Sequence, residues 1–76
     1  MSSAKIEKLV RMANQIGDFF AALPEAEGVA GAANHLRRFW TPKMIGEAIG
    51  AVKSGREGLN PTALAAIRAL SREQST

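Results

Sequence analysis

The sequence contains no cysteine, and it has only one histidine, His35, and one aspartate, Asp18. Without thiols the chain can form no disulfide, no thiolate zinc site, no cysteine-ligated iron–sulfur cluster and no cysteine nucleophile. The single histidine and aspartate argue against a metal site or a catalytic triad built from this chain alone. We therefore expect no catalytic, metal-binding or cofactor-binding residues in it.

Long hydrophobic runs are also missing. Apolar stretches such as residues 19–23 cover a few positions, whereas a membrane-spanning helix needs roughly 20. The start of the chain, MSSAKIEKLVRM, interleaves charges where a signal peptide requires a continuous apolar stretch. These features predict a soluble, cytoplasmic protein.

The chain is short, and its apolar residues can form only a small hydrophobic core. Its 76 residues suit a single domain, 1–76, and 46% of them are hydrophobic, but many of these are alanine. A core of this size rarely supplies more than about 3–5 kcal/mol of stability without disulfides, metals or oligomerisation. The net charge of +3 is spread along the chain, with no block that indicates nucleic acid or membrane as partner. Association with another protein chain is the remaining source of stability.

Apolar residues recur every three or four positions in four segments, which is typical of helices and not of strands. The predicted helices span residues 4–23, 26–39, 42–54 and 61–72. Thr41-Pro42 and Asn60-Pro61 each combine a capping residue with a proline at the first helical position, and Gly55 suits a left-handed helix end. We expect an all-α fold, a compact bundle of four short helices ordered over about residues 4–72, with frayed ends at 1–3 and 73–76.

Helical projection at about 100° per residue separates inner from outer positions. The inner stripe of the first helix comprises Ile6, Leu9, Ala13, Ile16, Phe20 and Leu23. Met12 and Phe19 fall at the margin of this stripe, and Arg38 lies nearly opposite the inner face of the second helix. Large apolar residues at the margin of the stripe are not needed to fill the core. We therefore expect Met12 and Phe19 to contact a partner.

Five glycines fall inside or at the edges of the predicted helices, at Gly17, Gly28, Gly31, Gly46 and Gly50. Each interior glycine costs roughly 0.8–1.0 kcal/mol relative to alanine, so their sum rivals the contribution of the whole core. Such glycines either let the four helices pack closely on one another or admit the backbone or side chains of another protein. We favour the second interpretation for some of them.

Residues 35–40, HLRRFW, hold the only histidine, the only tryptophan and two adjacent arginines. Leu36 and Trp40 also suit the core, and the arginines also complement a helix C-terminus. Tryptophan and arginine are, however, enriched among the residues that dominate binding energy at protein interfaces. The partner-binding residues that we predict are Met12, Phe19, His35, Arg37, Arg38, Phe39 and Trp40.

Three separated segments, MANQIGDFF (12–20), HLRRFW-T-P-K-M (35–44) and GLNPTALAAIRAL (58–70), follow one another in an order that resembles a known family. The chain is similar to the delta subunit of soluble NAD-dependent formate dehydrogenases over roughly residues 6–70. Members often have aspartate before the first helix-opening proline, where this chain has Thr41, and both residue types cap helices.

The resemblance implies a cofactor-free, non-catalytic accessory subunit of a larger complex. The other subunits of such a complex carry a molybdenum or tungsten pterin cofactor, iron–sulfur clusters and FMN, and they oxidise formate to carbon dioxide while reducing NAD. The implied partner is a large formate dehydrogenase subunit, foremost the catalytic one. The family transfers no catalytic residues to this chain.

Two other functions remain open from the residues alone. A small helical nucleic-acid-binding regulator would use the third or fourth helix for recognition, but the fourth helix has no basic residue before Arg68. An independent interaction module that forms homo-oligomers would also satisfy the composition.

Overall fold

The computed structural model describes residues 2–74, which form four helices. The helices are α1 (Ser2–Phe20), α2 (Glu25–Phe39), α3 (Pro42–Lys53) and α4 (Pro61–Gln74). Residues 2–74 contain no strand, which confirms the predicted all-α fold. Helix α1 begins at Ser2 and α4 ends at Gln74, two residues beyond each end of the ordered core expected over residues 4–72. The expectation for residues 1 and 75–76 lies outside the described residues.

The helices α3 and α4 begin at the two predicted caps. The Thr41 hydroxyl accepts a hydrogen bond from the Met44 amide at 3.1 Å, and the Asn60 side-chain oxygen accepts one from the Ala63 amide at 2.8 Å. Both bonds satisfy amides that the first helical turn leaves without a backbone partner. At the other end of α3, Gly55 has a φ of +84°, the left-handed conformation expected of a glycine after a helix. Local sequence therefore sets these boundaries.

The first helix ends earlier than its apolar stripe predicts. α1 stops at Phe20, and Leu23 lies in the connection to α2 with 45% of its surface exposed. Leu23 precedes Pro24, whose ring disfavours helical dihedrals in the preceding residue. The prediction of Leu23 as an inner residue is therefore wrong.

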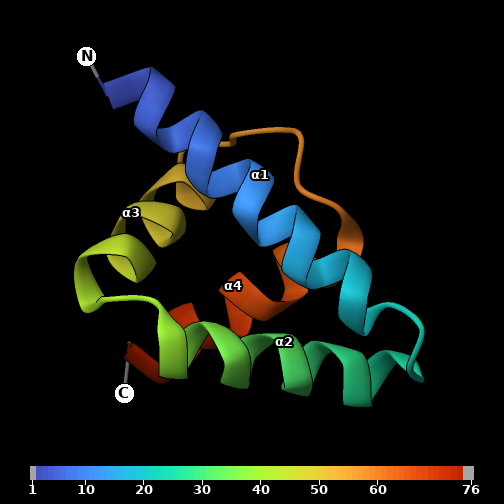
Figure 1. Cartoon of the computed structure of the whole chain (residues 1–76). Helices are drawn as coiled ribbons and strands as arrows, with labels where there is room; N and C mark the ends of the chain where they lie inside the picture. The colour runs from blue at the N-terminus through green and yellow to red at the C-terminus, as the bar shows by residue number, and fades with distance from the viewer. Residues whose placement is uncertain (1, 75–76) are drawn as a thin grey trace.

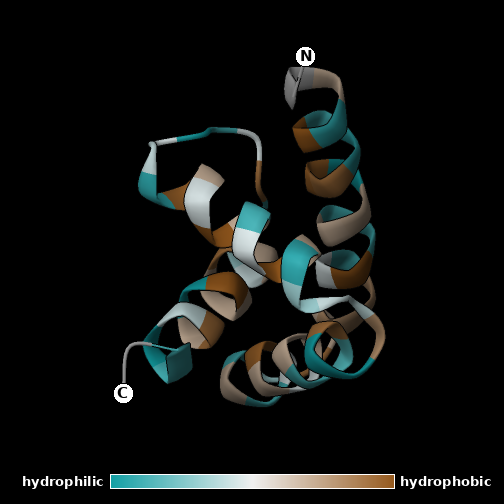
Figure 2. Ribbon diagram, turned by 90° about the vertical axis from the view of Figure 1, so that its left-hand side faces the viewer, coloured by the Kyte–Doolittle hydropathy of each residue, from teal (hydrophilic) through white to brown (hydrophobic). Residues whose placement is uncertain are grey.

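Helix α4 lies at the centre of the bundle. It packs against all three other helices, between α1 and α2 and beside α3 (Figure 1). The hydrophobic bands of the helices turn toward one another in Figure 2, with hydrophilic bands along the outside. The buried core comprises Leu9, Ala13, Ala32, Ala33, Leu36, Trp40, Ile45, Ala48, Ile49, Ala63, Ala66, Ile67 and Leu70. Its many alanines let the backbones approach closely but bury little apolar surface, as the composition predicts.

The long connection between α3 and α4 is fastened to α1 by two asparagines. The Asn14 side chain donates to the Gly58 carbonyl and accepts from the Asn60 amide, both at 2.8 Å. The Asn60 side chain donates at 3.0 Å to the Asn14 carbonyl and to an Asp18 carboxylate oxygen. These bonds hold the start of α4 against α1.

No helix within residues 2–74 combines the length and apolar character that crossing a membrane requires.

Candidate protein interface

Residues 2–74 contain no group of three or more histidine, aspartate or glutamate side chains placed to hold a metal ion. His35 lies between the rings of Phe20 and Phe39, with centroid distances of 6.2 and 4.7 Å. A general base would instead need a reacting group or an orienting carboxylate beside it.

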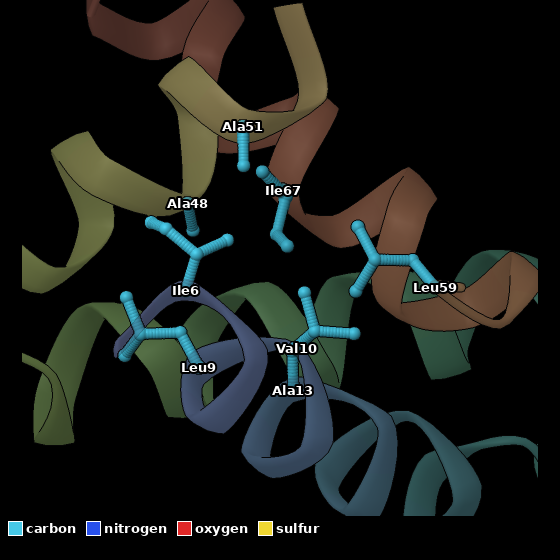
Figure 3. A pocket seen from close by; sticks show the side chains of 8 residues that line it. All are labelled: Ile6, Leu9, Val10, Ala13, Ala48, Ala51, Leu59 and Ile67. Carbon is cyan, nitrogen blue, oxygen red and sulfur yellow. The ribbon is translucent and has the colours of Figure 1, made fainter. Parts of the chain in front are cut away.

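One small cavity lies inside the bundle, where α1, α3, α4 and the connection at Leu59 meet (Figure 3). Its lining residues are all apolar: Ile6, Leu9, Val10, Ala13, Ala48, Ala51, Leu59 and Ile67. The cavity volume is about 10 Å³, which is at most the space of one water. The lining side chains offer no polar partner to a ligand. This cavity is a packing void of the alanine-rich core.

The most distinctive surface feature is a row of four rings that connects the end of α1 to the end of α2. We call the row Phe19, Phe20, His35 and Phe39 the aromatic surface. Phe19 and Phe20 meet edge to face, with centroids 5.0 Å apart and planes at 85°, a favourable aromatic geometry. His35 continues the row from Phe20 to Phe39. The two end residues are the most exposed large apolar side chains described, Phe19 at 77% and Phe39 at 66%.

Two glycines of α2 allow this row to form. A Cβ at Gly31 would lie 2.6 Å from two carbon atoms of the Phe20 ring, and a Cβ at Gly28 would lie 2.5 Å from the Phe20 carbonyl oxygen. Both distances are too short for a real side chain. The absence of side chains at Gly28 and Gly31 thus lets the end of α1 approach α2 and lets one edge of the Phe20 ring pack against Gly31.

These contacts correct part of the glycine interpretation. Gly17 likewise faces Asn60 and Ala63 of the same chain at distances that exclude a side chain. Gly17, Gly28 and Gly31 therefore serve internal packing and leave no room for another protein. At Gly46 and Gly50, by contrast, an added Cβ would meet no atom within 4 Å.

A shallow apolar hollow accompanies the aromatic surface. It has a volume of about 260 Å³ and is lined by Gln15, Ile16, Phe19, Phe20 and His35. The Arg38 guanidinium lies 5.8 Å from the centroid of the Phe39 ring, within the range of a cation–π contact. The surface therefore combines exposed rings, a hollow that can receive a side chain, and a cation at one end.

The remaining predicted partner-binding residues lie elsewhere or are already engaged. Trp40 is 7% exposed and belongs to the core, and Met12 is half-buried against it. Arg37 is exposed, but its guanidinium pairs with both carboxylate oxygens of Glu73, at 3.2 and 2.6 Å. We therefore leave these three residues out of the aromatic surface.

The helical projection places Ile16 and Phe20 on the inner stripe of the first helix, and neither is among the predicted partner-binding residues. Ile16 and Phe20 carry helical periodicity and therefore resemble core residues. The contact between Phe20 and Gly31 depends on how α1 crosses α2, and no short motif encodes it.

A comparison with protein families identifies the relatives of this chain. Residues 8–67 match the model of the NADH-dependent formate dehydrogenase delta subunit FdsD. The chain belongs to this family. The match covers most of the chain, and it confirms the resemblance seen in the sequence. Neither a curated protein nor a solved structure matches the chain.

Membership makes other subunits of a formate dehydrogenase complex the expected partners of this chain. The matched residues include the whole aromatic surface.

Proposed function

We propose that this chain is a non-catalytic accessory subunit of formate dehydrogenase that binds a large, cofactor-bearing subunit through its aromatic surface. Family membership supports the assignment to the complex. The exposure of Phe19 and Phe39, together with the Arg38 guanidinium beside the Phe39 ring, is the observation that supports this surface as the contact. Aromatic residues and arginine are enriched among the residues that dominate interface energies.

Burial of the aromatic surface by a partner would contribute favourably to the free energy of binding. Burial of a phenylalanine side chain contributes about 1.5–3 kcal/mol relative to its exposure to water. Phe19 and Phe39 can each make such a contribution because most of their surface is exposed in the isolated chain. The hollow beside Phe19 and Phe20 can in turn receive an apolar side chain of the partner.

Binding would also stabilise the chain itself. The core is rich in alanine and small, so the isolated domain is marginal for its size. A partner that binds only the folded state adds stability in proportion to the logarithm of its concentration relative to Kd. We propose that the chain supports the assembly of the complex and is itself stabilised by binding to it.

The redox chemistry belongs, in this proposal, to the other subunits. They would supply the molybdenum or tungsten pterin, the iron–sulfur clusters, FMN and the NAD site. The lack of cysteine excludes thiolate ligation of a cluster by this chain. The chain alone is expected to reduce no NAD when formate is added.

Co-purification tests the proposal. The tagged wild-type chain is expected to retain the large subunits, and the double variant Phe19→Ala/Phe39→Ala is expected to lose most of them. Leu23→Ala is the matched control, because Leu23 is also exposed but lies outside the ring row and its hollow. The helical circular dichroism of all three chains should be the same, since exposed substitutions usually change stability by less than about 0.5 kcal/mol.

Full recovery of the large subunits with the folded double variant would contradict the proposed contact surface. Failure of the wild-type chain to retain any subunit would contradict the accessory function itself.

A further inference from the structure

A second groove lies between α3 and α4, apart from the aromatic surface. It has a volume of about 330 Å³. Ile49, Val52 and Ile67 give it an apolar floor, and Lys53, Arg68 and Arg72 place three cations along it. Neither the sequence analysis nor family membership assigns this groove, and both arginines lie beyond the residues matched to the family.

The three cations have no acidic partner within residues 2–74. The ion pairs described there join Lys5 to Glu47, Arg37 to Glu73 and Arg56 to Glu7. Arg68 and Arg72 are four residues apart on one helix face, where like charges repel each other. The groove therefore holds concentrated positive charge that no described carboxylate offsets.

Helix dipoles explain only part of this arrangement. Lys53 lies in the last turn of α3 and Arg72 in the last turn of α4, where cations are favourable. Arg68 lies a full turn before Arg72 and gains little from the dipole, which acts within the last turn. Contact with another molecule would explain why all three cations gather at the groove.

We propose that this groove binds an acidic, partly apolar segment of a larger formate dehydrogenase subunit. This inference rests on the proposed function and adds a second contact to it. Guanidinium groups bind carboxylates through two parallel hydrogen bonds, so Arg68 and Arg72 suit aspartate or glutamate side chains. The apolar floor suits the hydrophobic side chains of the same segment.

A nucleic acid fits this groove less well than an acidic protein segment. Binding of single strands relies on aromatic side chains on which bases stack, and no aromatic residue lines the groove. Its three cations also form a smaller footprint than the extended basic face of a nucleic-acid-binding domain.

Co-purification of the complex with Arg68→Ala/Arg72→Ala is the first test. Recovery of the large subunits is expected to fall by about tenfold or more, as for removal of charges paired across an interface. Lys8→Ala/Lys43→Ala is the control with the same change in charge, because both lysines are exposed and neither lines the groove. Circular dichroism checks that both variants remain folded.

Carbodiimide cross-linking of the assembled complex is the second test, since this reagent joins a lysine amine directly to a carboxylate in contact with it. Mass spectrometry should find Lys53 joined to an aspartate or glutamate of a larger subunit, and this cross-link should disappear in Arg68→Ala/Arg72→Ala. Unchanged recovery with that variant, while the wild-type chain still retains the complex, would overturn the groove proposal and leave the accessory function intact. A cross-link from Lys53 only to a second copy of this chain, or nucleic acid released from the groove by salt, would also overturn it.

Discussion

Two pairs of helical glycines in this chain have opposite surroundings. On α2, a Cβ at Gly28 or Gly31 would lie 2.5 or 2.6 Å from atoms of Phe20. On α3, a Cβ at Gly46 or Gly50 would meet nothing within 4 Å. The packing of α1 against α2 therefore requires glycine at positions 28 and 31. Gly46 and Gly50 instead lie on the outer face of α3, where an added Cβ faces open space.

The difference teaches that the number of glycines in a helix does not by itself indicate an interface. The α2 glycines act on the aromatic surface indirectly, because they let Phe20 lie against α2 and join the row that leads to Phe39. The surface that we propose for the partner is made of side chains that remain exposed after this packing. Substitutions can test each side of the contrast.

Gly28→Ala should have the largest effect. The new Cβ would collide with a backbone oxygen, which cannot rotate away as a side chain can, so α1 and α2 must separate. Overpacking of this kind costs about 1–3 kcal/mol, and we expect a value near the upper end. That loss is most of the stability of so small a domain, and urea unfolding followed by circular dichroism would measure it. A stability equal to wild type would show that the two helices are not in close contact.

Asn60→Ala should have the next largest effect. It compares the residue that caps α4, Asn60, with the residue that caps α3, Thr41. The Asn60 side chain caps α4 and also donates to Asn14 and Asp18 of α1. Within residues 2–74, the Thr41 side chain instead takes part in a single described hydrogen bond, which it accepts from the Met44 amide of its own helix. Loss of a cap costs about 1 kcal/mol. Each further hydrogen bond contributes about 0.5–1.5 kcal/mol, and we expect values near the lower end because the bond to Asn14 is half-buried and the bond to Asp18 is exposed. Thermal unfolding should therefore show a greater loss for Asn60→Ala than for Thr41→Ala. Equal losses would contradict the described attachment of α4 to α1.

Gly46→Ala and Gly50→Ala should have the smallest effect, and it should be favourable. Both glycines are helical and face open space, so alanine restricts the unfolded chain without a clash in the folded one. Each substitution should raise the free energy of unfolding by about 0.4–1 kcal/mol in the same urea assay. A loss of stability at either position would mean that the outer face of α3 packs against the rest of the chain.

The sequence predicts those features of the fold that depend on neighbouring residues. Thr41, Asn60 and Gly55 lie where their capping chemistry requires, and periodicity identifies all four helices. Leu23 is the exception, because it continues the periodic stripe while the proline after it ends the helix. Its position could have been predicted by giving the steric effect of Pro24 more weight than periodicity.

The surface is less predictable because it depends on contacts between distant residues. Helical projection places Phe19 and Arg38 outside the inner faces, and both side chains are exposed. The projection cannot reveal that Arg37 pairs with Glu73, 36 residues away. Nor can it show that cations from α3 and α4 converge on one groove.

We propose that the aromatic surface is covered when the complex assembles. Hydroxyl-radical footprinting of the isolated chain and of the purified formate dehydrogenase complex measures this directly, since oxidation follows the solvent exposure of each side chain. We expect Phe19 and Phe39, 77% and 66% exposed in the chain alone, to become strongly protected in the complex. Equal oxidation of both phenylalanines in the free chain and in the complex would contradict it.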